Sequence, residues 1–175
     1  FTDYTTSEEF LIDYKKSGVD IQAGDNLVSW LQNPQNNTTV PTNPNFPESD
    51  VPDYRKRVLS GIGGFAALFD GRFQEMKHPV LVSCTDGVGT KVKLASYFND
   101  FSGVGQDLVA MCANDLICTG GTPLFFLDYY AVGKLELKAA QEFLTGVKRA
   151  CENSHLVLIG GETAEMPGVY QGHDF

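Results

Sequence analysis

A glycine-rich turn at residues 85–91 carries the residue types that hold a nucleotide phosphate and its metal ion. It consists of Thr-Asp-Gly-Val-Gly-Thr-Lys. Asp86 offers the hard carboxylate oxygens that Mg²⁺ prefers, while Gly87 and Gly89 leave backbone N–H groups open to an anion. Lys91 begins a predicted helix, whose N-terminus favours negative charge. The spacing is not that of a P-loop, and an ordinary turn followed by a solvated lysine explains the same residues, so both interpretations stay open here.

A second acidic residue, Asp115, interrupts the apolar pattern of a helix that we predict over about residues 107–118. A carboxylate near an apolar face is costly unless it is paired or binds a cation. Asp86 and Asp115 together would suit a Mg²⁺ ion that keeps some of its waters and bridges phosphate oxygens. Alternatively, Asp115 pairs with a lysine or caps a neighbouring element. Asp107 stands at the predicted helix start, where a role as N-cap is expected.

Two further stretches contain candidate ligand contacts. Residues 61–66, Gly-Ile-Gly-Gly-Phe-Ala, match a dinucleotide-binding fingerprint literally. That fingerprint needs a long helix directly afterwards, and Asp70-Gly71 would interrupt one after a single turn, so a phosphate-covering loop or a plain turn is favoured. Glu162 and Glu165 follow the last predicted strand, where loops of α/β folds carry ligands, although glutamates in loops are commonly just solvated.

The histidines and cysteines give no sign of a metal or redox site. The three histidines share no metal-ligand spacing, and none of the four cysteines belongs to a C-x-x-C pair. Cys112 and Cys118 lie in an apolar helical pattern and are predicted to be small buried side chains. We therefore expect reduced thiols, as in a cytosolic protein.

The elements that position these residues alternate along the second part of the chain. This order predicts an α/β (α+β-like) fold in which helices pack on a sheet. Strands are predicted at residues 80–84, 124–132 and 156–159, and helices at about 91–98, 107–118 and 137–152. The first part, residues 1–57, is predicted to hold a polar arm, a helix at residues 20–32 capped by Asp20, and a linker rich in proline and asparagine; residues 58–175 form the α/β domain.

Composition limits the partners of this 175-residue chain. Thirteen Lys+Arg against 22 Asp+Glu give a net charge of −9. Nucleic acids and anionic membranes both attract a basic surface, so neither is expected as a partner. There is no apolar run of roughly 20 residues, and the first residues lack the pattern of a secretory leader. We expect a cytoplasmic location.

Six segments, taken in order, closely resemble the phosphoribosylformylglycinamidine cyclo-ligase family, also called aminoimidazole ribonucleotide synthetases. They are residues 14–20, 61–65, 85–91, 107–115, 123–134 and 160–168, the last reading Gly-Gly-Glu-Thr-Ala-Glu-Met-Pro-Gly. The resemblance covers about residues 14–33 and 58–175, and residues 34–57 resemble an insertion relative to bacterial members. It implies the ATP-binding domain of that superfamily. It also implies ATP-dependent closure of formylglycinamidine ribonucleotide to aminoimidazole ribonucleotide, releasing ADP and phosphate.

The resemblance also implies roles for individual residues. Asp86 and Asp115 match the family's metal- and ATP-associated acids, with Asp115 and Lys91 taken as catalytic. The other matches are given by position: Gly87, Gly89, Thr90 and Lys91 for the nucleotide phosphates, Gly63 and Gly64 for a flexible nucleotide loop, and Glu162 and Thr163 for the ribonucleotide substrate. The implied cofactors are ATP and Mg²⁺.

Family members are roughly twice as long and have two α/β domains, so we expect this chain to be the N-terminal half. In the family this half forms a homodimer through its sheet, and the aromatic stretch at residues 125–130 would suit such an interface. Two alternatives are kept. One is another ATP-using member of the superfamily: an amidotransferase synthetase subunit, selenophosphate synthetase or thiamine-phosphate kinase. The other is a non-catalytic dimerisation module.

Overall fold

The centre of the fold is a β-α-β unit in a computed structural model that describes residues 13–36 and 53–170. Strand β1 (Phe125–Val132) leads through helix α4 (Leu137–Asn153) to strand β2 (Val157–Glu165), and the strands pair in parallel. The pairing runs from Phe125 opposite Val157 to Val132 opposite Glu165, with a bulge after Phe126. A helical crossover is the usual way to join parallel neighbours, so the alternating pattern predicted this unit correctly.

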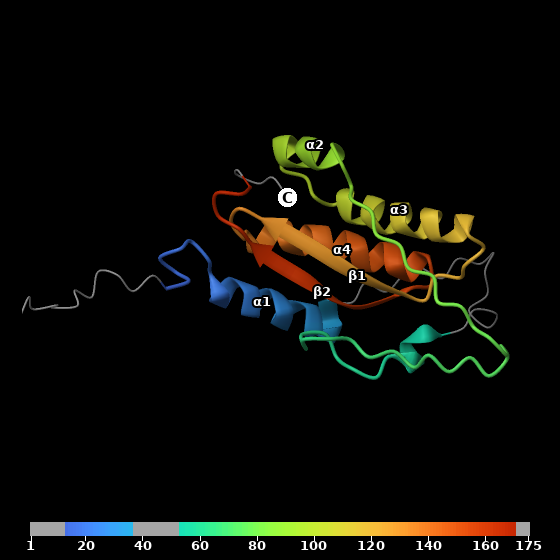
Figure 1. Cartoon of the computed structure of the whole chain (residues 1–175). Coiled ribbons are helices and arrows are strands. Elements are labelled where there is room, and N and C mark those ends of the chain that lie inside the picture. The colour runs from blue at the N-terminus through green and yellow to red at the C-terminus, as the bar shows by residue number, and fades with distance from the viewer. Residues whose placement is uncertain (1–12, 37–52, 171–175) are drawn as a thin grey trace, which may run out of the picture.

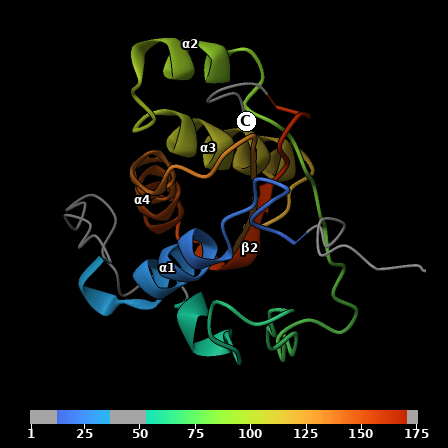
Figure 2. The same ribbon diagram turned by 90° about the vertical axis from the view of Figure 1, so that its left-hand side faces the viewer.

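Helix α4 packs on one face of this sheet through an apolar stripe. Phe143, Leu144 and Val147 are fully buried, and the Phe143 ring stacks on that of Tyr130 in β1 with centroids 5.1 Å apart. Helix α3 (Val104–Cys118) crosses α4 closely, because Gly105 lies against the carbonyl of Phe143 and leaves no room for a Cβ. Figure 2 shows α1, α3 and α4 on the same side of the sheet.

Helix α1 (Ile21–Gln32) begins as the sequence predicts, because the Asp20 side chain accepts a hydrogen bond from the N–H of Ala23. It is followed by the short 3-10 helix η2 (Pro34–Asn36). Lys148 of α4 is only 7% exposed and donates to the carbonyl of Asn36 at 2.9 Å. This bond ties the N-terminal segment to the β-α-β unit. The remaining linker, residues 37–52, and the N-terminal arm lie outside the described residues.

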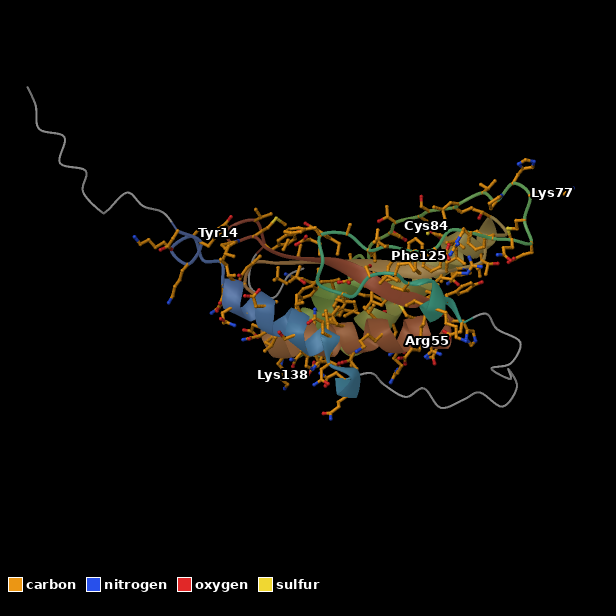
Figure 3. All side chains as sticks on the ribbon, turned by 90° about the horizontal axis from the view of Figure 1, so that it is seen from below. Tyr14, Arg55, Lys77, Cys84, Phe125 and Lys138 are labelled. Carbon is orange, nitrogen blue, oxygen red and sulfur yellow. The ribbon has the colours of Figure 1, made fainter. Side chains whose placement is uncertain are left out.

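The other face of the sheet is covered only in part. The chain from the 3-10 helix η4 (Tyr54–Arg57) onward runs past this face to helix α2 (Lys91–Phe98), as Figure 1 shows. Leu127 and Tyr129 of β1 remain 54% and 61% exposed. Figure 3 shows Cys84 and Phe125 on the side of the sheet away from Lys138 of α4.

The structure confirms helices packed on a sheet and corrects one strand. Residues 80–84, predicted as a strand, form an extended irregular segment without a strand partner, and Val80 is 86% exposed. A run rich in valine is stable as a strand only when its backbone groups pair with a neighbour. The last predicted strand is too short, because β2 continues from Ile159 to Glu165. In the described ranges, no helix is both long and apolar enough to cross a bilayer.

Candidate functional site

A cavity of about 810 Å³ lies between the segment at residues 80–89, helix α3 and strand β1. Its size is in the range of small-ligand sites. Apolar side chains such as Leu108, Leu116 and Phe126 form much of its lining, and the turn residues Asp86 and Gly89 line it as well. The structure therefore places the glycine-rich turn in the wall of this mostly apolar cavity.

The turn has an open backbone. Asp86 Oδ1 accepts the N–H of Gly87 at 2.8 Å, which fixes the carboxylate over its own turn. Gly89 adopts φ +71°, a conformation that side chains with a Cβ rarely adopt. Thr90 occupies the N-cap of α2 without a side-chain capping bond. The N–H groups of Val92 and Lys93, in the first turn of α2, donate to the carbonyls of Gly89 and Thr90.

Lys91, the first residue of α2, forms an ion pair with Asp107 of α3, with Nζ 2.9 Å from Oδ2. The prediction that Asp107 caps its helix is wrong, because α3 begins three residues earlier, after the N-cap Gly103. The helix begins earlier because Val104 and Gly105 are buried against α4. Asp107 instead holds the Lys91 ammonium beside the turn, and both side chains remain substantially exposed.

Asp86 and Asp115 both lie within electrostatic range of the thiol of Cys112. Cys112 Sγ lies 4.0 Å from the carbonyl of Asp86, and Asp115 follows Cys112 by about one turn of α3. Burial raises the pKa of the Cys112 thiol, and the charges of Asp86 and Asp115 add to the rise. Two acids that are 29 positions apart in the sequence thus act on the same thiol.

These two carboxylates are the oxygen donors available to a divalent cation here. Within residues 13–36 and 53–170, no cluster of three or more His, Cys, Asp or Glu side chains is arranged to hold a metal. Mg²⁺ commonly takes one or two carboxylates and fills its other positions with waters and phosphate oxygens. The donor set fits Mg²⁺ together with a phosphate ligand. Asp115 is exposed, so the expected conflict with an apolar environment does not arise.

Gly63 and Gly64 lie away from this turn. Gly63 has φ +101° and packs against Val28 and Gln32 of α1, whose side-chain amide donates to the carbonyl of Ile62 at 2.7 Å. Figures 1 and 2 both place the loop after η4 beside α1, at the opposite end of the molecule from α2. In the described chain no helix begins directly after this loop, and a dinucleotide-binding fingerprint would need one there. Its part in nucleotide binding stays a prediction.

Glu162 and Thr163 lie within strand β2, and not in a loop as predicted. They pair with Tyr129 and Tyr130 respectively, because the parallel register continues past Gly160 and Gly161. Glu162 is exposed and Thr163 is half-buried. Paired residues of parallel strands point to the same face, so Glu162 lies on the open face with Tyr129, which lines the cavity.

Sequence reasoning missed Asp128, which lies in the middle of β1. Its face of the strand also carries the buried Phe126 and Tyr130. The carboxylate lies against Gly161 so closely that a Cβ there would collide with it. Burial raises the pKa of Asp128 to about 7, and the neighbouring Glu162 adds to the rise. The sequence signal that could have singled out Asp128 is its position as an acid within an otherwise apolar strand.

Glu165 was predicted to lie in a loop, but it is the last residue of β2. Its carboxylate acts as a clamp, because it accepts hydrogen bonds from two separate segments. One carboxylate oxygen accepts the N–H of Asp20 at 2.6 Å, and the other accepts the N–H of Leu135 at 2.7 Å. The clamp joins the start of α1, the end of β2 and the connection from β1 to α4. Gly18 packs on Pro167 just beyond it. The segment at residues 13–20 is thereby fixed at the carboxyl ends of the strands.

Comparison with known proteins identifies the family. The family model described as AIR synthase related protein, N-terminal domain, matches residues 45–174. The chain belongs to this family. Among its curated relatives, a phosphoribosylformylglycinamidine cyclo-ligase from Nitrosococcus oceani is 47% identical over 164 residues, which is 94% of this chain. The resemblance found in the sequence is confirmed, and the α/β class of this AIR synthase related domain agrees with the β-α-β unit.

The chain spans 42% of the length of that cyclo-ligase. The comparison therefore concerns the AIR synthase related N-terminal domain alone. Asp86, Lys91 and Asp115 all lie inside the matched range.

Proposed function

We propose that this chain is the nucleotide-binding part of an ATP-dependent cyclo-ligase. The reaction closes formylglycinamidine ribonucleotide to aminoimidazole ribonucleotide and releases ADP and phosphate, a step of purine biosynthesis in the cytoplasm. The observation that carries the proposal is the 47% identity to a named cyclo-ligase across nearly the whole chain. Asp86, which lines the cavity, and Asp115, whose charge acts on the Cys112 thiol of the same cavity, support it.

In this proposal the glycine-rich turn binds the phosphates of ATP. Gly89 and Thr90 contribute backbone N–H groups just before α2, where the helix dipole also favours an anion, and Gly87 contributes its N–H once the Asp86 carboxylate releases it. Lys91 is held nearby by Asp107, whose Oδ2 lies 2.9 Å from the lysine Nζ. The ammonium group can leave that carboxylate and pair with a phosphate oxygen instead. Preorganised positive groups of this kind stabilise the charge that develops during phosphoryl transfer.

Asp86 and Asp115 hold Mg²⁺ in this proposal. Bound there, the ion supplies positive charge that neutralises phosphate oxygens. Asp86 comes from the segment before α2 and Asp115 from α3, so a bound ion would link these two parts of the chain. Such local positive charge would let a chain of net charge −9 bind a polyanion.

Glu162 and Thr163 are the proposed contacts for the ribonucleotide substrate, with less structural support than the turn. Glu162 lies on the open face of the sheet, next to a tyrosine that lines the cavity. The same open face is the proposed homodimer surface, because Leu127, Tyr129 and Leu81 leave apolar area exposed there. A second copy of the chain would cover it. Sedimentation analysis of Tyr129→Glu against the parent protein tests this: the variant should dissociate.

The function is tested by ring closure in the protein at its full length. Asp86→Asn and Asp115→Asn should each lower the rate of ADP release and aminoimidazole ribonucleotide formation by about a hundredfold or more. Asp25→Asn, an exposed carboxylate on α1, is the matched control and should keep the parent rate. Normal turnover by both site variants would overturn the metal assignment, and absence of ring closure in the parent would overturn the activity.

A further inference from the structure

Two cysteines from different elements meet at the wall of the cavity. Cys84 lies on the irregular segment before the turn, and Cys112 lies on α3. Cys84 Sγ is 3.2 Å from the carbonyl oxygen of Cys112, and Cys112 Sγ is 4.0 Å from the carbonyl oxygen of Asp86. Each thiol is thus directed at the backbone of the other cysteine's segment, and both side chains line the same cavity.

These thiol contacts are the hydrogen bonds that join the segment to α3. Within the parts of the chain that the structure describes, no backbone–backbone hydrogen bond involves residues 77–88. A segment held so lightly can move to let a sulfur–sulfur bond form, whereas a strand in a ladder would resist the movement. The chain between the two cysteines includes α2 and its turns, so a disulfide would enclose α2 in a covalently closed loop.

We propose that Cys84 and Cys112 form a reversible dithiol–disulfide site that hydroperoxides oxidise. Cys84 is exposed and Cys112 is buried, so a peroxide meets Cys84 first. The Cys84 thiol gives up its proton and its sulfur attacks one peroxide oxygen; an S–O bond forms, the O–O bond breaks, and with hydrogen peroxide the leaving hydroxide takes up that proton and departs as water.

The second step consumes the sulfenic acid on Cys84. The sulfur of Cys112 attacks the Cys84 sulfur, an S–S bond forms, the S–O bond breaks, and the departing hydroxide takes the Cys112 proton as a second water. Two thiols are oxidised by two electrons, and one peroxide is reduced to two waters. A small dithiol reductant reverses the change by thiol–disulfide exchange.

The site is a modification site and goes beyond the proposed cyclo-ligase activity. Asp86 is two residues from Cys84, and its carbonyl is the present partner of the Cys112 thiol. The disulfide would take that partner away and fasten the turn covalently to α3. Cytosolic disulfides are commonly transient, which agrees with a reversible site.

The test is a peptide map of the purified protein after mild hydrogen peroxide, with free thiols alkylated before digestion. Trypsin alone leaves Cys112 and Cys118 in one peptide, so cleavage before Asp115 is added to separate them. We expect a linked pair containing Cys84 and Cys112, lighter by two hydrogen atoms than the separate peptides and lost after dithiothreitol. Cys118→Ser, which removes the exposed cysteine at the end of α3, should give the same pair.

In the variant Cys112→Ser, Cys84 should stop at the sulfenic acid and react with dimedone. If that variant fails to fold, the map of the parent protein still decides. The inference is overturned if Cys84 becomes a sulfinic acid while Cys112 stays alkylatable. It is equally overturned if Cys84 links to Cys118, or to a second molecule.

Discussion

Asp128→Asn should stabilise the protein at alkaline pH and have little effect at acidic pH. Burial beside Gly161 raises the pKa of Asp128 from its ordinary value of 3.8 to about 7. For an acid whose pKa is raised by folding, the favourable contribution is complete below the ordinary value and is lost as the pH rises through about 7. The difference between the two values corresponds to about 4 kcal/mol, which the folded state loses above neutrality.

The charged groups around Asp128 support the sign of this effect. Glu162 of β2 is a second acid that disfavours the ionised form, and the Cys151 thiol of α4 has a raised pKa through burial first and then through Asp128. Asparagine keeps the shape of the carboxylate and does not ionise. It therefore removes the cost at high pH while filling the same space against Gly161.

The assay is urea unfolding, followed by the fluorescence of the single tryptophan, Trp30, at a series of pH values. The advantage of Asp128→Asn over the parent should grow between about pH 4 and pH 7 and level off above. Asp25→Asn, at an exposed position, should show no such trend. A difference between Asp128→Asn and the parent that stays constant with pH, or a variant less stable at pH 8, would refute the assignment of a buried, raised-pKa carboxylate.

Two further changes test the packing and the clamp. Gly105→Ala should lower the free energy of unfolding by about 1–3 kcal/mol in the same urea assay, because its Cβ would meet the carbonyl of Phe143; Gly103→Ala, with open space around it, should change little. Glu165→Gln should cost about 1–3 kcal/mol, measured by thermal unfolding, because its amide nitrogen would face a backbone N–H where an oxygen now accepts one. An unchanged midpoint in either variant would contradict the contact concerned.

The helices were predictable because their patterns are local. The spacing of apolar residues and the cap at Asp20 predicted α1, and the start of α2 at Lys91 followed from the turn before it. The start of α3 was not predictable from capping preferences. Burial of Gly105 against Phe143 decides it, and that contact depends on a helix more than 30 residues away in sequence.

The strands depended on partners that a single segment does not reveal. Residues 80–84 have strand composition, yet they lie against α3 through Cys84 and do not join the sheet. The extension of β2 to Glu165 follows from the parallel register with β1, and Gly161 permits it by leaving space for the Asp128 side chain. The role of Glu165 as a clamp could not be predicted for the same reason, since the two backbone N–H groups that its carboxylate accepts belong to distant segments.

The residue types of the candidate site could be predicted from the sequence, but their arrangement in space could not. Its chemistry-bearing residues Asp86, Lys91 and Asp115 were identified from residue types, order and resemblance, and in the structure both Asp86 and Asp115 act electrostatically on Cys112. The ion pair between Lys91 and Asp107 needed the structure, because it depends on how α2 and α3 lie relative to each other.

The most direct test of the central claim is a calorimetric titration of the protein with ATP in the presence and absence of Mg²⁺. The parent protein should bind ATP with Mg²⁺ and bind it far more weakly without the ion. Asp86→Asn and Asp115→Asn should each weaken binding by about tenfold or more, which corresponds to about 1.4 kcal/mol, while Asp25→Asn binds like the parent. No heat of binding at millimolar nucleotide, or equal affinity in all four proteins, would contradict a nucleotide and metal site between the glycine-rich turn and α3.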